Sequence, residues 1–377
     1  MTSSRPLRIA HLDTGLNLRG GQRQLLSLAL GLRKRGHWQI VVCREESELE
    51  GRARAEGFPC FSLPSHDPGH VYGIVQLRQL LRAAPCDLLH AHDGRGQTLV
   101  FLASMGLPVR RVASRRVAFL PKHHWTHRLK YAYTCDAVIA VSDFIRQGSI
   151  RCGVPRSKID LIPDGIEIPS DLPTPEIRAK ARAGWGFARG DFLVGHLGAF
   201  TPEKGQEVAL EAFQLLRERL PQAGLLLAGE GPTLRVREIT QQCESLGARI
   251  RLCGAVLDVA EFFSALDLFI MPSKSEGLGS SALLAMSYGL PVVASRVGGL
   301  AELVVEGRTG WLIEPNSPLA LSQAIVDAAA DRAGLQQWGL YAREHARQFS
   351  VDIMVARTEA LYCRVLFREP HAREGAK

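Results

Sequence analysis

The chain has 377 residues, 46% of them apolar and 22% charged, with a formal net charge of +8 at pH 7. This length and apolar content can supply two buried cores, so two domains are expected rather than one. No run approaches the roughly 20 apolar residues of a membrane span, and the N-terminus enters a strand-like segment without the apolar core of a signal peptide. These features exclude an evident integral membrane protein and favour a cytosolic one.

Metal and disulfide sites are not indicated. The eight cysteines are dispersed without a C-x-x-C pair, so they are expected to be reduced core residues. His90 and His92 share one face if their segment is a strand, but no third ligand is evident beside them. Because no D-x-D pair is present either, we expect a metal-independent site with no cofactor.

Charge is uneven along the chain. Residues 1–165 hold 24 Lys and Arg against 13 Asp and Glu, a net of +11, whereas residues 166–377 hold 22 against 25, a net of −3. The most basic stretch, residues 110–130, also carries Phe119, Leu120 and Trp125. This composition suits an anionic membrane surface, and a solvated basic face is the alternative. No helix-turn-helix, zinc-finger or base-stacking pattern accompanies it, so nucleic-acid binding is not expected.

The first half alternates predicted strands and helices. Because repeated βα units form parallel sheets, a doubly wound sheet is expected. Gly20 and Gly21 lie in a loop at 14–21 that lacks the G-x-G-x-x-G spacing, so they serve either a backbone turn or close approach to a ligand. A Pro-Asp-Gly turn after Ile162 places the domain boundary near 165. The strands are predicted at 7–12, 38–43, 58–63, 88–92, 109–114 and 137–141, and helices at 22–35, 71–84 and 96–105.

The second half restarts this alternation. Strands are predicted at 192–197, 225–228 and 250–253, a helix at 206–220, and helices again at 318–332, 335–349 and 351–367. Lys204 lies in the loop from Gly198 to Gly205, directly before a helix. It is either an ordinary exposed lysine or a cation that adds to the helix dipole in stabilising a leaving diphosphate.

Residues 267–303 contain two strand, glycine loop and helix units in succession. Strands are predicted at 268–271 and 291–295, and a helix at 280–288. Glu276 lies in the first loop, and Gly298 and Gly299 open a helix after the second. In a parallel sheet both loops lie at the carboxyl edge, where helix N-termini suit a diphosphate and Glu276 can accept hydrogen bonds from sugar hydroxyls. The alternative is an ordinary α/β core segment with a surface glutamate.

The stretch resembles the signature of glycosyltransferase family four, which consists of retaining nucleotide-sugar transferases of GT-B architecture. The matching positions are Pro272, Ser273, Glu276, Gly277, Gly279, Ala285, Met286, Gly289, Pro291, Val292, Val293 and Ala294. The resemblance implies two Rossmann-like domains facing a cleft: an acceptor-binding domain at 1–165 and a nucleotide-sugar domain at 166–349. It further implies that residues 350–377 form a helix crossing back to the N-terminal domain, followed by a frayed tail.

The resemblance also implies site residues and partners. Lys204 would stabilise the diphosphate, Glu276 would bind the donor sugar, and His92 would lie on the acceptor side, although a buried core histidine is the alternative for His92. The acceptor would be a glycan or a lipid-linked molecule, as in cell-envelope or lipopolysaccharide synthesis, at the inner face of the cytoplasmic membrane. The remaining donor-site and loop positions are Gly20, Gly21, Gly198, Gly229, Gly231, Gly254, Gly277, Leu278, Gly279, Ser280, Gly298 and Gly299.

Three positions depart from the family pattern. Leu284 stands where the family has a second glutamate that binds ribose, Ala199 where many members have an arginine, and Arg116 where an acceptor-side histidine is usual. These departures leave open a GT-B module that binds a nucleotide sugar or an anionic glycan without turnover. A sugar epimerase on the same fold is a third possibility.

Overall fold

A computed structural model describes residues 5–64, 71–118, 128–247, 249–256 and 258–367. The chain divides into two compact units. Unit 1 combines residues 5–165 with 351–367, and unit 2 consists of the described residues within 166–350. Among the described helices, none has both the length and the apolarity needed to cross a bilayer.

Unit 1 contains a seven-stranded parallel sheet in the order β3-β2-β1-β4-β5-β6-β7. Its sequence returns to the centre at β4, so the chain runs outward in one direction from β1 and in the other from β4. The strands are β1 (Arg8–Leu12), β2 (Trp38–Arg44), β3 (Cys60–Leu63), β4 (Leu88–Ala91), β5 (Arg110–Arg115), β6 (Ala137–Ala140) and β7 (Ile159–Leu161).

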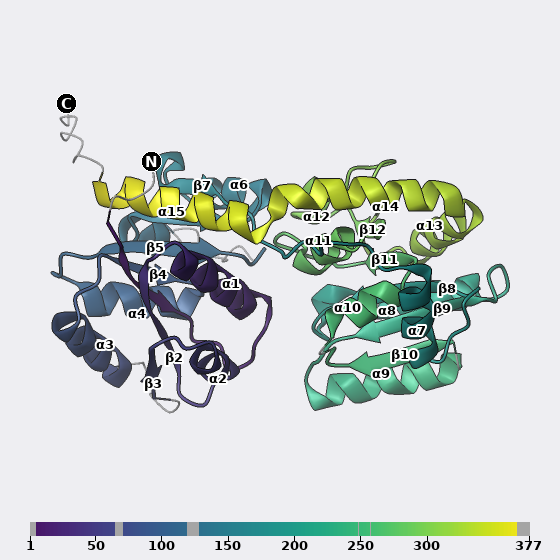
Figure 1. Cartoon of the computed structure of the whole chain (residues 1–377), viewed down its shortest axis with the longest axis horizontal. Helices are drawn as coiled ribbons and strands as arrows, with labels where there is room; N and C mark the ends of the chain where they lie inside the picture. Colours follow the sequence, from purple (N-terminus) through teal and green to yellow (C-terminus); the bar gives the residue numbers. More distant parts are fainter. Residues whose placement is uncertain (1–4, 65–70, 119–127, 248, 257, 368–377) are drawn as a thin grey trace. The chain divides into compact units, whose positions relative to one another are not determined.

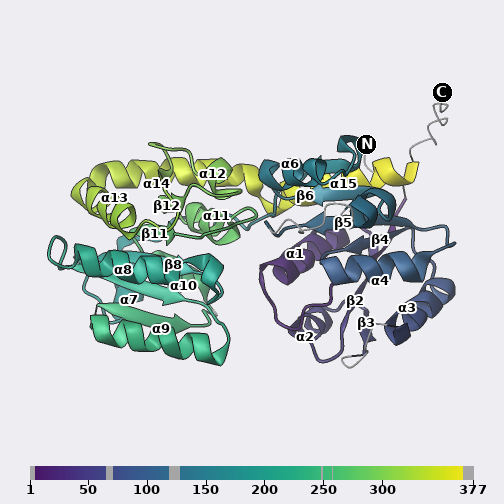
Figure 2. The ribbon, with the colours of Figure 1, turned by 180° about the vertical axis from the view of Figure 1, so that it is seen from behind.

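Helices cover both faces of this sheet. Because successive strand residues point to opposite faces, Ile9 packs with α1 and α15, whereas Ala10 packs with α3 and α4. Figure 1 shows the last helix, α15, beside α1, and Figure 2 shows α3 and α4 side by side. The helices are α1 (Gly20–Lys34), α2 (Glu48–Ala55), α3 (Val71–Ala83), α4 (Gly94–Ser104), α6 (Asp143–Arg151) and α15 (Val351–Phe367).

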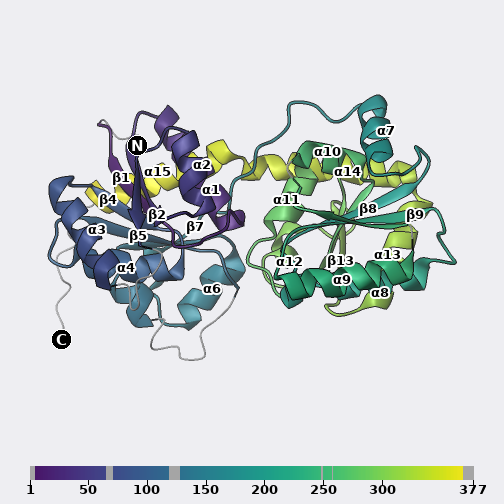
Figure 3. The same ribbon diagram turned by 90° about the horizontal axis from the view of Figure 1, so that it is seen from below.

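Unit 2 repeats the plan with a six-stranded parallel sheet in the order β10-β9-β8-β11-β12-β13. Helix α8 packs with α9 and α13 on one face, while α7 packs with α10 and α11 with α14 on the other (Figure 3). The strands are β8 (Phe192–Leu197), β9 (Ala223–Ala228), β10 (Ile250–Gly254), β11 (Leu268–Met271), β12 (Val292–Ser295) and β13 (Gly310–Ile313). The helices are α7 (Pro175–Gly184), α8 (Gln206–Leu216), α9 (Thr233–Leu246), α10 (Val259–Ala265), α11 (Ser280–Ser287), α12 (Leu300–Leu303), α13 (Pro318–Ala330) and α14 (Arg332–Ala346).

The architecture confirms the predicted pair of doubly wound sheets and the return of the last helix to the first half. Met354 of α15 accepts a hydrogen bond from the Gly165 backbone, and Glu359 of α15 pairs with Arg35 and His37. Some predicted ends shift by a few residues: the helix expected at 22–35 begins at Gly20. Helices α2, α6, α7, α9 and α10 and strands β7 and β13 were not predicted.

The basic stretch at 110–130 is only partly a surface. Residues 119–127 lie outside the described residues, and residues 110–115 form β5, an interior strand of the sheet. Arg115 is only 7% exposed and lies against the Tyr131 ring, while Arg110 is paired with Asp136. The described part of this stretch therefore packs within unit 1 rather than presenting a continuous basic face.

Candidate active site

The topology of unit 2 brings two loops together at the carboxyl edge of its sheet. Strands β8 and β11 are neighbours, although the chain leaves them in opposite directions along the sheet. Ligands of open α/β sheets bind at such a switch point. The loop after β8 carries Lys204 in the short 3₁₀ turn Pro202–Lys204, and the loop after β11 carries Glu276.

Lys204 and Glu276 form a direct ion pair at this edge. The Lys204 Nζ donates to Glu276 Oε2 at 2.6 Å, and the two side chains are 24% and 13% exposed. Each group is thus held in place while part of it stays accessible to solvent. A cation and a carboxylate so arranged can bind a phosphate and a sugar hydroxyl of one ligand.

Glycines allow the loop after β11 to make close backbone contact with the loop after β8 and with the loop after β12. At Gly205, where φ is +70°, an added Cβ would lie 2.0 Å from the Pro272 carbonyl oxygen. At Gly298, where φ is +50°, it would lie 1.9 Å from the Glu276 carbonyl oxygen. The Lys274 backbone N–H also donates to the Glu203 carbonyl at 2.8 Å. Close backbone contact therefore fixes the positions of Lys204 and Glu276.

The substitution Gly205→Ala tests this contact. We expect it to destabilise unit 2 by roughly 2 to 4 kcal/mol, because it adds a steric clash to the strain of a positive φ. Gly307→Ala is the matched control, since Gly307 has the same φ of +70° with no atom within 4 Å of the added Cβ. Urea unfolding of both variants measures the difference. Equal destabilisation would show that the backbone contact contributes nothing.

A buried histidine, not predicted from the sequence, supports the Lys204 loop. His196 is 0% exposed and its Nδ1 donates to the Ile270 carbonyl at 3.1 Å, so its Nε2 accepts from Gln206, 3.3 Å away. The same Gln206 amide donates to the Ala199 carbonyl. Burial lowers the pKa of His196 to about 4, which keeps it neutral. In the sequence, this support could be inferred only from a histidine and a glutamine on either side of the loop.

The other predicted donor-site positions lie on the same edge of unit 2. Gly229, with φ of +146°, approaches the Gly198 carbonyl, and Gly231 approaches that of Phe200. Gly254 has φ of +63° and open space around it. Gly277, Leu278 and Gly279 are buried, and Ser280 begins α11. The helix after Gly299 is a single turn, Leu300–Leu303, so its dipole is weaker than that of the longer helix expected there.

Leu284 lies half-buried on α11, one helical turn after Ser280. Ala199 is half-buried in the loop after β8, and its carbonyl accepts from Gln206. Both departures from the family pattern therefore lie on elements that border the Lys204 and Glu276 pair. Neither supplies a charged side chain to this edge.

Unit 1 has a polar cluster at its own switch point, where β1 and β4 are neighbours. Asp13, 1% exposed, accepts from the Gly15 backbone and from Gln22. Burial and the nearby Asp93 raise the Asp13 pKa. Asp13 was not predicted as a site residue, although its position directly after the first strand could have indicated one. Arg116 lies on the same edge, where its Nε donates to Asp164 at 2.8 Å.

The prediction that no third ligand lies beside His90 and His92 is wrong. The register pairs His11 with His90, and the ligand atoms of the three buried histidines lie within 4.8 Å of one another. Hydrogen bonds engage both ring nitrogens of each histidine, with Tyr362 and Ser114 as the partners of His90. The geometry is that of a hydrogen-bonded cluster, and a metal would have to displace these bonds.

Gly20 and Gly21 open α1, where Gly20 is exposed and Gly21 is half-buried. An added Cβ at either position would meet no atom within 4 Å, so the fold of unit 1 does not require glycine there. At Gly15 an added Cβ would instead lie 2.4 Å from Gln22 Nε2. The fold therefore requires glycine at Gly15 of this loop rather than at Gly20 or Gly21.

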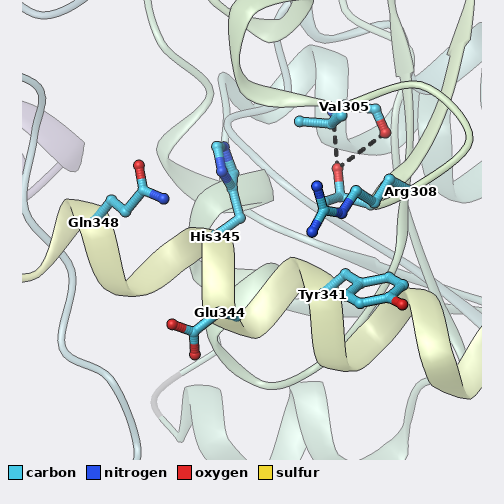
Figure 4. A pocket seen from close by; sticks show the side chains of 7 residues that line it. Val305, Arg308, Tyr341, Glu344, His345 and Gln348 are labelled. Atoms are coloured by element: carbon cyan, nitrogen blue, oxygen red, sulfur yellow. Dashed lines mark hydrogen bonds between the residues drawn. The ribbon is translucent and has the colours of Figure 1, made fainter.

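A separate cavity of about 140 Å³ lies in unit 2, away from these residues (Figure 4). Arg308 lies over the Tyr341 ring, 5.0 Å from its centroid, and Thr309 bonds to the Val305 backbone. Glu344, His345 and Gln348 complete the lining. None of the predicted site residues borders this cavity.

Comparison with known proteins assigns the family. A model of Glycosyltransferase Family 4 matches residues 18–168, and a model of Glycosyl transferases group 1 matches residues 191–331. A GDP-mannose-dependent alpha-(1-6)-phosphatidylinositol monomannoside mannosyltransferase of Mycolicibacterium smegmatis is 29% identical over 266 residues, which are 65% of this chain and 69% of the relative. A D-inositol 3-phosphate glycosyltransferase of Streptomyces avermitilis is 29% identical over 332 residues, 81% of this chain and 71% of the relative.

A solved structure agrees in fold. Anabaena Alr3699/HepE, in complex with UDP and glucose, superposes with a TM-score of 0.84 at 24% identity, covering 94% of this chain and 99% of that one. Two Rossmann-like sheets and a returning last helix are therefore the GT-B fold. The chain belongs to glycosyltransferase family 4, whose members are retaining nucleotide-sugar transferases that are generally metal-independent.

Proposed function

We propose that the chain transfers a sugar, with retention of configuration, from a nucleoside diphosphate donor held by unit 2 to an acceptor hydroxyl held by unit 1. The observation that carries this proposal is the ion pair of Lys204 and Glu276, 2.6 Å apart at the switch point of unit 2. The Lys204 ammonium would bind the diphosphate and Glu276 the hydroxyls of the donor sugar. Residues 254–256 would contact the base through the main chain.

In this reaction the bond between the sugar C1 and the diphosphate oxygen breaks, and the acceptor oxygen bonds to C1 on the same face. The acceptor proton passes to the departing diphosphate, which leaves as the free nucleotide. Negative charge grows on the diphosphate as the bond breaks, so a fixed cation stabilises the transition state more than the ground state. Lys204 has that role, and no enzymic nucleophile is assigned.

For the acceptor we propose a phosphorylated polyol or a glycan on a lipid carrier. Arg116 supports an anionic acceptor group, because Asp164 orients its guanidinium while other N–H groups remain available. Two relatives act on inositol 3-phosphate and on a phosphatidylinositol mannoside. Gly20, Gly21 and His92 would lie near this acceptor. A role in cell-envelope or lipopolysaccharide synthesis would follow from a lipid-linked acceptor.

We further propose that unit 1 binds the inner face of the cytoplasmic membrane. Helices α3 and α4 pack together and contain no acidic residue, and they expose Tyr72, Val75 and Leu102, with Met105 exposed directly after α4. Apolar side chains beside arginines suit an anionic bilayer. Co-sedimentation with phosphatidylglycerol vesicles should retain the protein, and Val75→Asp with Leu102→Asp should release it. Equal retention of this double variant would contradict the proposed face.

The transferase proposal is tested with a panel of UDP, GDP and ADP sugars. A transferase should slowly hydrolyse one donor without an acceptor and use it faster with inositol 3-phosphate or a lipid-linked glycan. Mass spectrometry of the released nucleotide identifies the donor. Binding of a donor without hydrolysis or transfer would contradict catalysis, and conversion to an epimer would identify a different reaction.

The substitution Leu284→Glu tests the missing ribose contact. A carboxylate one turn from the start of α11 should accept hydrogen bonds from the donor ribose, which are worth about 1.5 to 3 kcal/mol to a charged group. We expect the KM for the donor to fall roughly ten- to two-hundredfold. Leu319→Glu, at a 69% exposed leucine on α13, is the control and should leave KM unchanged. An unchanged or higher KM for Leu284→Glu would show that ribose is not bound at this position.

A further inference from the structure

A directed chain of hydrogen bonds runs through the interior of unit 1. It starts at Gln39 on β2, whose Nε2 donates to the Ala29 carbonyl at 2.9 Å. Since a carbonyl can only accept, the Gln39 amide group must face it with its NH₂ group, and Oε1 must face His11. His11 Nε2 lies 2.9 Å from that oxygen and therefore carries a proton.

The donor and acceptor nitrogens of His11 and His92 follow in turn. Burial lowers the pKa of His11 to about 4, so the ring is neutral and its Nδ1 is an acceptor. His92 Nε2, 3.0 Å away, must be the donor to it. Burial, with His90 and Arg116 nearby, lowers the pKa of His92 well below its ordinary value, so its own Nδ1 carries no proton and can accept.

The chain of hydrogen bonds ends at Arg116, whose side chain is partly accessible to solvent. Arg116 Nη1 lies 3.4 Å from His92 Nδ1, and Arg116 Nε donates to Asp164. The Arg116 side chain is 14% exposed, and its Nη2 has no hydrogen-bond partner among the described residues. Two of its nitrogens are thus used for positioning, and the third can meet a ligand.

We propose that Gln39 and His11 lock the tautomer of His92, so that His92 positions Arg116 to bind an anionic group of the acceptor. Gln39, His11 and His92 are positioning residues here, and Arg116 is the residue that touches substrate. This inference rests on the proposed function for its kinetic part only. The other tautomer of His92 would direct an N–H at the Arg116 guanidinium and push it away from that position.

Two substitutions of His92 separate its two hydrogen bonds. The oxygen of His92→Asn lies near the place of Nδ1, so this variant keeps an acceptor for Arg116 and loses the bond to His11. His92→Gln places its amide near Nε2, so it keeps the bond to His11 and loses the acceptor. Both changes have similar polarity and burial, which makes the pair a matched comparison.

The kinetic test uses the donor from the sugar panel with inositol 3-phosphate as the probe acceptor. We expect His92→Gln to raise the KM for inositol 3-phosphate at least tenfold, while His92→Asn raises it less than threefold. An equal rise in both variants would overturn the positioning role.

A spectroscopic test is independent of the reaction, and its wild-type measurement needs no variant. Long-range ¹H–¹⁵N spectra of the wild-type protein with labelled histidine report each tautomer directly. At pH 7 both His11 and His92 should be the Nε2–H tautomer, and in Gln39→Leu the two signals should become mixtures. A protonated Nδ1 on wild-type His92 would overturn the proposal, even if transferase activity were found. Correct tautomers with no donor hydrolysis would instead contradict the proposed function alone.

Discussion

Replacing Lys204 by methionine should lower kcat/KM roughly a hundred- to a thousandfold. Methionine has a similar length and no charge, so the variant loses the cation that we propose stabilises the departing diphosphate. Removing one such fixed electrostatic group from an active site typically costs about two to three powers of ten in rate. The assay is donor turnover by the wild-type protein and the variant at saturating acceptor.

The control for this experiment is Lys274→Met. Lys274 is exposed on the loop after β11, and its contact with the Lys204 loop is made by its backbone N–H. Its side chain can therefore be removed without disturbing that contact, and we expect activity within a factor of about two of the wild type. Thermal melts of both variants would confirm the fold. Similar losses in both variants would show that general charge, and not the position of Lys204, supports the reaction.

The protein should lose stability as the pH falls from 6.5 to 5. His11 in unit 1 and His196 in unit 2 are 0% exposed, and burial lowers the pKa of each to about 4. In the unfolded chain a histidine has a pKa of about 6.5. Between these values the unfolded state binds a proton that the folded state does not, so lower pH favours unfolding.

The expected loss is about 2 kcal/mol for each of these histidines between pH 6.5 and 5, since one pKa unit corresponds to about 1.4 kcal/mol. His90 and His92, whose pKa values burial also lowers, act in the same direction. Asp13 opposes them, because its pKa is raised. Urea unfolding followed by circular dichroism at pH 7.5, 6.5, 5.5 and 5 measures the change.

A variant controls the assignment of this pH dependence. His11→Gln removes one titrating group from unit 1, so its stability should depend less steeply on pH than that of the wild type, whatever its stability at pH 7.5. Free energies of unfolding that stay constant from pH 7.5 to 5 would contradict the buried neutral state of these histidines. Carboxylates in ion pairs take up protons mainly below this pH range, so they do not affect the comparison of the two proteins.

Much of the fold follows from sequence patterns that act locally. Runs of apolar residues and the glycines between them predict β8, β11 and α15, and the predicted ends match those in the structure. Short amphipathic helices such as α2 were missed, because eight residues with few apolar positions give a weak periodic signal. Their stability comes from packing: Leu49 and Ala53 of α2 are buried against β2.

The edge of unit 2 that we propose holds the donor could be predicted, because its residues lie in two short motifs. Lys204 and Glu276 each lie in a glycine loop, and parallel pairing of β8 and β11 brings these loops together. The histidine chain could not be predicted, since His11 and His92 are far apart in sequence and meet only through the register of β1 and β4. Hydrogen-bond direction likewise depends on Gln39, which reaches His11 from a third strand.

The central claim is that Lys204 and Glu276 hold the donor. A crystal structure of the protein with the nucleotide sugar identified by the panel tests it most directly. We predict Lys204 Nζ within hydrogen-bond distance of a phosphate oxygen and the Glu276 carboxylate on a sugar hydroxyl, with α11 beginning at the diphosphate. A donor bound elsewhere in the chain, with the 2.6 Å bond between Lys204 and Glu276 intact and no ligand beside it, would contradict the claim.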